Sequence, residues 1–176
     1  MSTLYIAHPA SLDHQTPLGH PERPDRIRAI ERALEKERFT SLVREQAPMA
    51  QIESLALAHP EDYIIRLRDI SPREGLVRID EDTVMSPGTY EAALRAAGGA
   101  VLAVDEIMSG KATNAFVAMR PPGHHATRDR AMGFCYLNSI AVAVLESLAA
   151  GITKAAVFDF DVHHGNGTEA ILLDHP

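Results

Sequence analysis

The chain has 176 residues, 45% of them hydrophobic, and its 24 acidic residues outnumber 17 lysines and arginines for a formal charge of −7. This length suits one domain with a substantial core, and an acidic balance without any cluster of Lys or Arg argues against sequence-independent binding to nucleic acid. The single cysteine excludes an internal disulfide, and we see neither a secretory signal nor a run of roughly 20 apolar residues, so we expect a cytoplasmic protein that is not bound to a membrane.

The first half of the chain predicts one strand and two helices. The short apolar run Leu4–Ala7 is typical of a strand. Pro24 begins a helix in which apolar residues recur on one face, and Pro60 begins a shorter helix of the same kind. The segment Ile52–Ala58 is compatible with more than one structure.

The second half alternates helices with short apolar strands. We expect, in order, a long helix between Ser86 and Gly110, a strand over 115–118, a helix from Asn138 to about Ala150, a central strand over 155–158 and a helix from Gly167 to Leu173. Gly98 and Gly99 interrupt the apolar stripe of the long helix, which predicts close packing against a neighbour. This alternation indicates an α/β domain with a mainly parallel sheet of three or four strands.

Two polar clusters follow the last two predicted strands: RPPGHH after 115–118 and DFDVHHGNG after 155–158. In open parallel sheets, ligands bind beyond the carboxyl ends of the strands. Asp161 and His163 project to the same side of an extended backbone and could converge on zinc, which accepts oxygen and nitrogen ligands. A catalytic zinc usually takes three protein ligands, however, and a turn with solvated polar groups explains this pair equally well.

The other polar residues of the clusters predict a proton relay. Asp159 lies deeper in the predicted strand and needs a partner, which His124 or His125 can provide as a His–Asp pair. Cys135 has no neighbour that would activate it, so we expect a packed apolar residue rather than a nucleophile.

Three N-terminal histidines have a different expectation. His8, His14 and His20 are irregularly spaced among prolines, which favours solvated loop residues over a metal cluster.

RPPGHHA (120–126), GFCYLN (133–138) and DFDVHHGNGT (159–168) together resemble the histone deacetylase superfamily. The similarity is greatest to the class II type, which includes bacterial histone deacetylase-like amidohydrolases and acetylpolyamine amidohydrolases. HPERPDRI (20–27) and DTVMSPGTYEAALRAAGGA (82–100) resemble earlier segments of the same family. The resemblance implies an arginase–deacetylase-type three-layer fold, of which residues 1–176 would form the N-terminal part of a single domain, apparently truncated.

The resemblance also implies a zinc-dependent amide hydrolase that removes acetyl groups from acetyl-lysine or acetylpolyamine-type substrates. The roles it implies are zinc ligation by Asp161 and His163, proton handling by His124, His125 and Asp159, substrate contacts by Gly133, Phe134 and Asp82, and a structural potassium site on the backbone oxygens of Asp159, Asp161 and His163.

Two departures and one gap qualify these expectations. Asn166 replaces a relay aspartate of class I relatives, and Gly165 replaces a carboxylate of the two-manganese arginases, which argues against an arginase-like hydrolase. The family's third zinc ligand and its catalytic tyrosine have no counterpart in this sequence. Asp174 and His175 are the only late candidates, and neither lies in a matching motif. We therefore expect the isolated chain to bind zinc weakly and to be an inactive fragment, or a non-catalytic one that associates, for example as a homo-oligomer, through an exposed sheet edge.

Overall fold

The computed structural model describes residues 2–173, so Asp174 and His175 lie outside the described part. The strands are β1 (Thr3–Ala7), β2 (Val43–Gln46), β3 (Val77–Arg78), β4 (Val84–Met85) and β5 (Asn114–Ala118). The α-helices are α1 (Asp25–Leu34), α2 (Ile52–Ala56), α3 (Glu61–Ile70), α4 (Thr89–Met108), α5 (Ser139–Ala149) and α6 (Asn166–Leu172). Short 3-10 helices follow β1 and α1, at η1 (Pro9–Leu12) and η2 (Glu37–Phe39).

The main sheet has the order β2-β1-β5, and both of its pairings are parallel. Leu4 of β1 lies opposite Val43 on one side and Ala115 on the other, so β1 is the central strand. A separate antiparallel ribbon joins β3 to β4. The prediction of an α/β domain with a mainly parallel sheet is confirmed.

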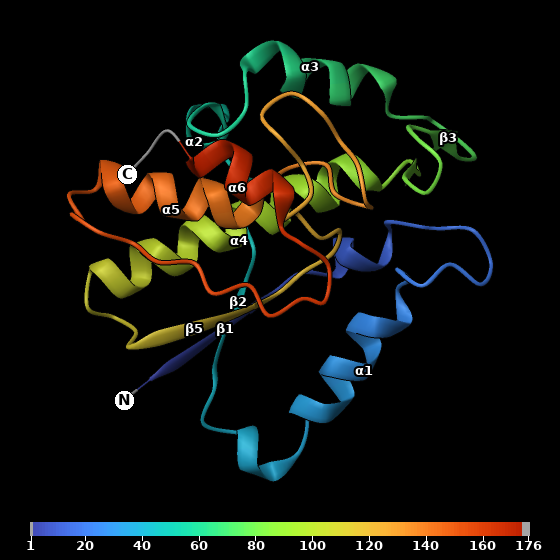
Figure 1. Ribbon diagram of the computed structural model, residues 1–176. Helices are drawn as coiled ribbons and strands as arrows, with labels where there is room; N and C mark the ends of the chain where they lie inside the picture. The colour runs from blue at the N-terminus through green and yellow to red at the C-terminus, as the bar shows by residue number, and fades with distance from the viewer. Residues whose placement is uncertain (1, 174–176) are drawn as a thin grey trace.

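Helices cover the two faces of this sheet (Figure 1). Leu4 and Ile6 point to one face and pack with Ala103 of α4. Tyr5 points to the opposite face, where its hydroxyl donates a hydrogen bond of 2.6 Å to Glu31 of α1. Because successive side chains of a strand alternate in direction, the side chains of β1 contact the helices on both faces of the sheet.

The packing of α4 depends on the paired glycines near its middle. A Cβ atom at position 98 would overlap the backbone carbonyl of Pro48 and lie 2.6 Å from the backbone nitrogen of Ala50. Ala50 N also donates a hydrogen bond of 3.0 Å to Leu94 O. The helix therefore lies against the 47–50 segment at backbone distance, which confirms the predicted close packing.

The larger apolar core lies away from the sheet, among α2, α3, α4, α5 and α6. Its buried side chains include Leu55, Ile64, Leu67, Tyr136, Leu137, Val142, Leu145 and Ile171. The Asn138 side chain caps α5 by accepting a hydrogen bond of 3.1 Å from Ala141 N, as predicted. This core fixes the 120–138 region, which carries His124, His125, Gly133 and Phe134 of the candidate site.

The predicted central strand over 155–158 is wrong. Residues 153–160 form no strand, and the connection from α5 to α6 is drawn as coil in Figure 1. A strand requires a neighbour that satisfies its backbone N–H and C=O groups, and within residues 2–173 no strand pairs with this run. Its side chains are exposed as a result, Phe158 to 87%.

Among residues 2–173, no helix combines the length and the apolar character that crossing a membrane requires.

Candidate active site

The two polar clusters meet where β5 ends and α6 begins. His124 and His125 follow β5 after the turn at Pro121–Gly123, and Asp159 to Asn166 lead into α6. The backbone N–H groups of Gly167 and Thr168 donate hydrogen bonds of 3.0 and 3.1 Å to the carbonyl oxygen of His124. N–H groups in a first helical turn have no partner within the helix, so these contacts hold α6 against the tandem histidines.

His124 forms the predicted pair with Asp159, with 2.8 Å between His124 Nδ1 and Asp159 Oδ2. A carboxylate only accepts in this contact, so Nδ1 carries a proton, and in the neutral ring Nε2 is then the acceptor. The hydrogen bond with His124 lowers the pKa of the Asp159 carboxyl from its ordinary value. Gly165 makes room for the pair, because a Cβ at position 165 would lie 2.5 Å from Asp159 Oδ2.

His125 has a neutral partner. Its Nδ1 lies 2.6 Å from Asn166 Oδ1, so the amide oxygen fixes the same tautomer without adding a charge. The two imidazole rings lie side by side, with 4.1 Å between their centroids. Sequence reasoning treated Asn166 as the loss of an aspartate partner, whereas the structure shows it in contact with His125.

Asp161 and His163, the predicted zinc ligands, contact each other. Asp161 Oδ1 lies 2.9 Å from His163 Nδ1 and accepts a hydrogen bond of 2.8 Å from His163 N. That backbone hydrogen bond lowers the pKa of the Asp161 carboxyl. Both side chains are open to solvent, 47% exposed for Asp161 and 70% for His163, and the His163 ring lies 6.0 Å from that of His125.

These two side chains are of the types that bind zinc, but they are fewer than the three protein ligands of a catalytic zinc site. A carboxylate oxygen and an imidazole nitrogen are both ordinary zinc ligands. Among the described residues, however, no group of three or more His, Cys, Asp or Glu side chains could hold a metal ion. The described chain thus brings together two candidate donors where a catalytic zinc ion takes three.

The predicted substrate-contact residues form a rim beside His125. A Cβ at position 133 would lie 2.5 Å from the His125 ring, so Gly133 packs directly on that imidazole. Phe134 has a positive φ of 68°, and its backbone N–H donates a hydrogen bond of 3.0 Å to the Thr83 hydroxyl. The neighbouring Asp82 is exposed, and its carboxylate accepts a hydrogen bond of 3.0 Å from the same hydroxyl.

His20 belongs to this rim, although sequence reasoning placed it in a solvated loop. Its ring packs edge-on against Phe134 with 4.7 Å between centroids, and its Nε2 lies 3.1 Å from the carbonyl oxygen of Asp82. The signal that could have identified it is the HPERP stretch at 20–24, which the family resemblance already included.

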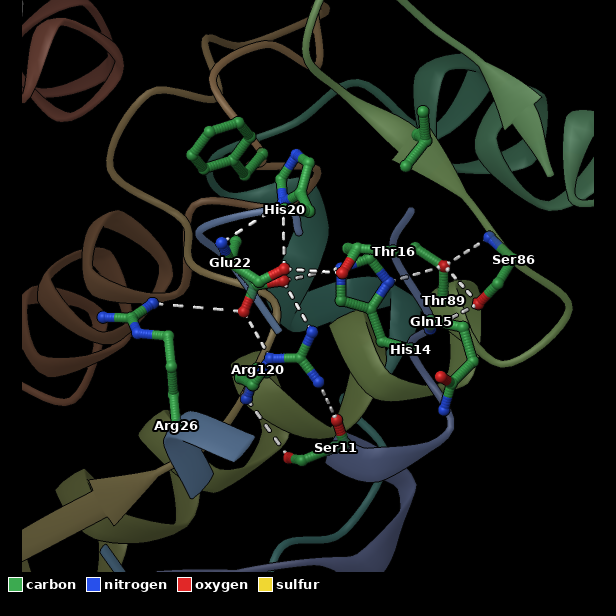
Figure 2. Close-up of polar contacts among 12 residues, drawn as sticks. Ser11, His14, Gln15, Thr16, His20, Glu22, Arg26, Ser86, Thr89 and Arg120 are labelled. Carbon is green, nitrogen blue, oxygen red and sulfur yellow. Dashed lines mark hydrogen bonds and ion pairs between the residues drawn. The ribbon is translucent and has the colours of Figure 1, made fainter. Parts of the chain in front are cut away.

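A buried ionic network supports the rim from below (Figure 2). Arg120 and Glu22, only 2% and 1% exposed, form a two-pronged ion pair in which Arg120 Nη2 lies 2.6 Å from Glu22 Oε2. The other carboxylate contact of Arg120 is made through Nε. Arg120 N also donates a hydrogen bond of 3.1 Å to the Ser11 hydroxyl. The pair therefore links the loop that carries His20 to the turn that carries His124.

His14 completes this network, which corrects its assignment as a solvated residue. It is 1% exposed, with Nε2 3.1 Å from Glu22 Oε2 and Nδ1 2.8 Å from the Thr89 hydroxyl at the start of α4. Burial lowers the pKa of His14 below its ordinary value, against the opposing effect of Glu22. Burial alone would raise the pKa of Glu22, but hydrogen bonds from His14 and Arg120 outweigh it and lower that pKa to about 2.

Cys135 is the packed residue that its sequence context predicts. Its side chain is fully buried, and burial raises the pKa of the thiol to about 12. A thiol held in the neutral form is a poor nucleophile, which agrees with a packing role.

Comparison with known proteins matches the profile of the histone deacetylase domain to residues 20–176. The chain is 41% identical over 155 residues to the histone deacetylase-like amidohydrolase of Pseudomonas aeruginosa, an alignment that covers 87% of this chain and 40% of that protein. It is 39% identical to a probable deacetylase of Methanothermobacter thermautotrophicus, over 96% of this chain and 50% of the relative.

Among solved structures, the HD domain of HDA15 superposes with a TM-score of 0.91 at 34% identity and covers 97% of this chain and 50% of its own. The chain therefore has the fold of that domain and spans about half the length of the relatives it matches.

Proposed function

The chain belongs to the histone deacetylase family, and on that premise we propose that its paired histidines carry the proton transfers of a zinc-dependent amide hydrolase that deacetylates amines. The observation that supports this proposal is the pair of side-by-side imidazoles, each held in one tautomer by its own partner. His124 is held by Asp159 at 2.8 Å and His125 by Asn166 at 2.6 Å. In both rings Nε2 is the atom left free for a proton.

The two partners differ in charge, and this difference suggests a division of roles. Amide hydrolysis requires one group to take a proton from the attacking water and another to give a proton to the leaving amine. Asn166 orients His125 without a charge, so His125 is the group we assign to the water. The Asp159 carboxylate stabilises the positive charge that His124 carries once protonated, so His124 is the group we assign to the amine.

Asp161 and His163 are the residues that would hold a zinc ion in this proposal. The chemistry that zinc supplies in such a site is polarisation of the amide carbonyl and a lower pKa for bound water. Backbone oxygens of Asp159, Asp161 and His163 remain the predicted ligands of a structural potassium ion.

The substrate that we propose is an acetylated amine, from a protein lysine or a polyamine. Gly133 and Phe134 would flank the acyl chain next to His125, and the exposed Asp82 carboxylate would receive a polar group of the substrate at the rim. The His20 ring packs edge-on against Phe134 and would keep that ring in position.

The test is a fusion of residues 1–176 to the part of the Pseudomonas relative that this chain does not match. We expect the folded fusion to release acetate from an acetyl-lysine peptide or from acetylspermidine, and to lose this activity after chelation. His125→Asn should abolish turnover while zinc content and thermal stability stay unchanged. A folded, zinc-loaded fusion that releases no acetate from either substrate would contradict the proposal.

A further inference from the structure

The hydroxyl of Thr83 joins two parts of the rim that come from distant segments of the chain. Thr83 directly precedes β4 and is fully buried. Its hydroxyl donates a hydrogen bond of 3.0 Å to Asp82 Oδ1 and accepts one of 3.0 Å from the backbone N–H of Phe134. A hydroxyl has one proton to donate, and here the Asp82 carboxylate receives it. One buried oxygen atom therefore contacts both of the side-chain-bearing residues that we propose for the two walls of the rim.

The turn that carries Thr83 is closed by other atoms. Ile79 N donates a hydrogen bond of 2.8 Å to Thr83 O, which closes the connection between β3 and β4. The Asp80 carboxylate accepts hydrogen bonds of 3.1 and 2.8 Å from the backbone N–H groups of Asp82 and Thr83. Because backbone atoms and Asp80 hold the turn, the Thr83 hydroxyl is left for its contacts with Asp82 and Phe134.

Phe134 depends on such a contact because its backbone lies in the left-handed region. A φ of 68° is uncommon for a residue other than glycine and persists where the surrounding structure holds it. The Thr83 hydroxyl holds the N–H of Phe134, and two residues later the Tyr136 hydroxyl donates a hydrogen bond to the carbonyl oxygen of Val84. The segment that carries Phe134 is thus joined to β4 at two points, and the Thr83 contact is the one made at Phe134 itself.

The same hydroxyl restricts the orientation of the Asp82 side chain. A surface carboxylate loses rotational freedom when it binds a ligand, and this loss reduces affinity. The hydrogen bond from Thr83 removes part of that freedom in advance, and His20 Nε2 lies 3.1 Å from the carbonyl oxygen of Asp82. The Asp82 carboxylate is therefore oriented before any ligand arrives, which favours binding.

We propose that Thr83 is a positioning residue for substrate binding: its hydroxyl fixes the Asp82 carboxylate and the Phe134 backbone in register with each other, and acts on the substrate through them. This inference rests on the proposed function in taking Asp82 and Phe134 as substrate contacts. Thr83 has no contact with the paired histidines His124 and His125 in the structure, so its effect is on affinity and not on the proton transfers.

Hydrogen exchange in the chain alone tests the contact without substrate or metal. We expect the Phe134 amide to exchange slowly in the unsubstituted chain and in Thr83→Ser, which keeps the hydroxyl. In Thr83→Val, which has the same branched shape without the hydroxyl, this amide should exchange about 10-fold faster, while the Ile79 amide stays protected. Thr40→Val is the matched control, because the Thr40 hydroxyl donates to Glu37 O within its own turn at 2.9 Å. It should leave exchange at Phe134 unchanged.

Ligand binding to the fusion described above tests the consequence for the substrate. The probes are an acetyl-lysine peptide and acetylspermidine, and the fusion carries His125→Asn so that binding is measured without turnover. Thr83→Val should weaken binding by about 10-fold, and Thr83→Ser should restore it. In the active fusion Thr83→Val should raise KM by a similar factor without lowering kcat, which is the result expected when binding is lost equally in the ground state and the transition state.

A double-mutant cycle separates positioning from a general structural effect. Asp82→Ala removes the carboxylate that Thr83 orients. In that background Thr83→Val should weaken ligand binding less than it does alone, because the contact with Phe134 is then the one that remains to be lost. Additive losses of affinity would show that Thr83 does not act through Asp82.

Failure of this inference differs from failure of the proposed function. A fusion that binds an acetylated ligand, loses affinity in Thr83→Val and releases no acetate upholds the inference and counts against the proposed function. Four results would each overturn the inference: free exchange of the Phe134 amide in the unsubstituted chain, unchanged affinity or loss of folding in Thr83→Val, additivity in the cycle, and a fusion that binds neither probe.

Discussion

Replacement of Arg120 by methionine should destabilise the isolated chain strongly, because it leaves the Glu22 carboxylate buried without its main partner. The pKa of Glu22 is lowered to about 2 from an ordinary 4.5 by His14 and Arg120 together, against the opposing effect of burial, and at about 1.4 kcal/mol per pKa unit the whole difference corresponds to about 3 kcal/mol. Breaking a buried ion pair on one side typically costs about 3–5 kcal/mol. We expect Arg120→Met to lower the free energy of unfolding by about 3 kcal/mol or more at pH 7.

Urea denaturation followed by far-ultraviolet circular dichroism measures this loss. Arg23→Met is the matched control, since Arg23 forms an exposed ion pair with Asp25 and should cost about 0.5 kcal/mol or less. The double variant Glu22→Gln, Arg120→Met should be more stable than Arg120→Met alone, because no uncompensated charge remains. A loss below about 1 kcal/mol for Arg120→Met, or simple additivity in the double variant, would refute the reasoning.

Acidification should lower the free energy of unfolding in two steps. The pKa of His14 is lowered in the folded chain, so its contribution to stability is present above about pH 6.5 and is lost as the pH falls below that value. The contribution of Glu22 is lost between pH 4.5 and about 2. Unfolding curves across this range check it, and Glu22→Gln should remove the lower step. Gly165→Ala should reduce acetate release by the fusion roughly 100-fold, because the new Cβ would lie 2.5 Å from Asp159 Oδ2; unchanged turnover would contradict the relay geometry. Gly98→Ala should destabilise the chain by about 1–3 kcal/mol, measured by urea denaturation, because α4 could no longer approach the backbone at Pro48. The isolated chain should retain less than stoichiometric zinc after dialysis, and Asp161→Ala should lower the retained amount further; tight binding with one zinc per chain would contradict the two-donor site.

Helices were predictable wherever the apolar pattern alone specifies them. The stripe along α4 and the Asn138 cap of α5 are local signals, and both elements lie where the sequence places them. The run 155–158 was not predictable in the same way, because an apolar tetrapeptide becomes a strand only beside a neighbour, and within the described residues it has none. The apolar runs at Leu4–Ala7 and 115–118 did become strands, because β1 and β5 pair with each other.

The candidate site shows the same limit. The pairing of His124 with Asp159 followed from the positions of two motifs after predicted strands, and the structure places the two side chains 2.8 Å apart although the second strand is absent. His14 was missed because its burial depends on Glu22 and Arg120, and Arg120 is more than one hundred residues away in sequence. A histidine between prolines looks solvated until the tertiary structure supplies its partners.

The left-handed backbone at Phe134 makes this position a conflict between two selections. A non-glycine residue at a φ of 68° costs about 1–2 kcal/mol relative to an ordinary conformation, and glycine would relieve that cost. A library randomised at position 134 and sorted for thermal stability should therefore enrich glycine and asparagine. The same library sorted for catalysis should keep an aromatic ring, because the ring lies beside His20 at the rim. Different residues in the two sorted pools would show that position 134 loses folding free energy in order to keep an aromatic ring at the rim.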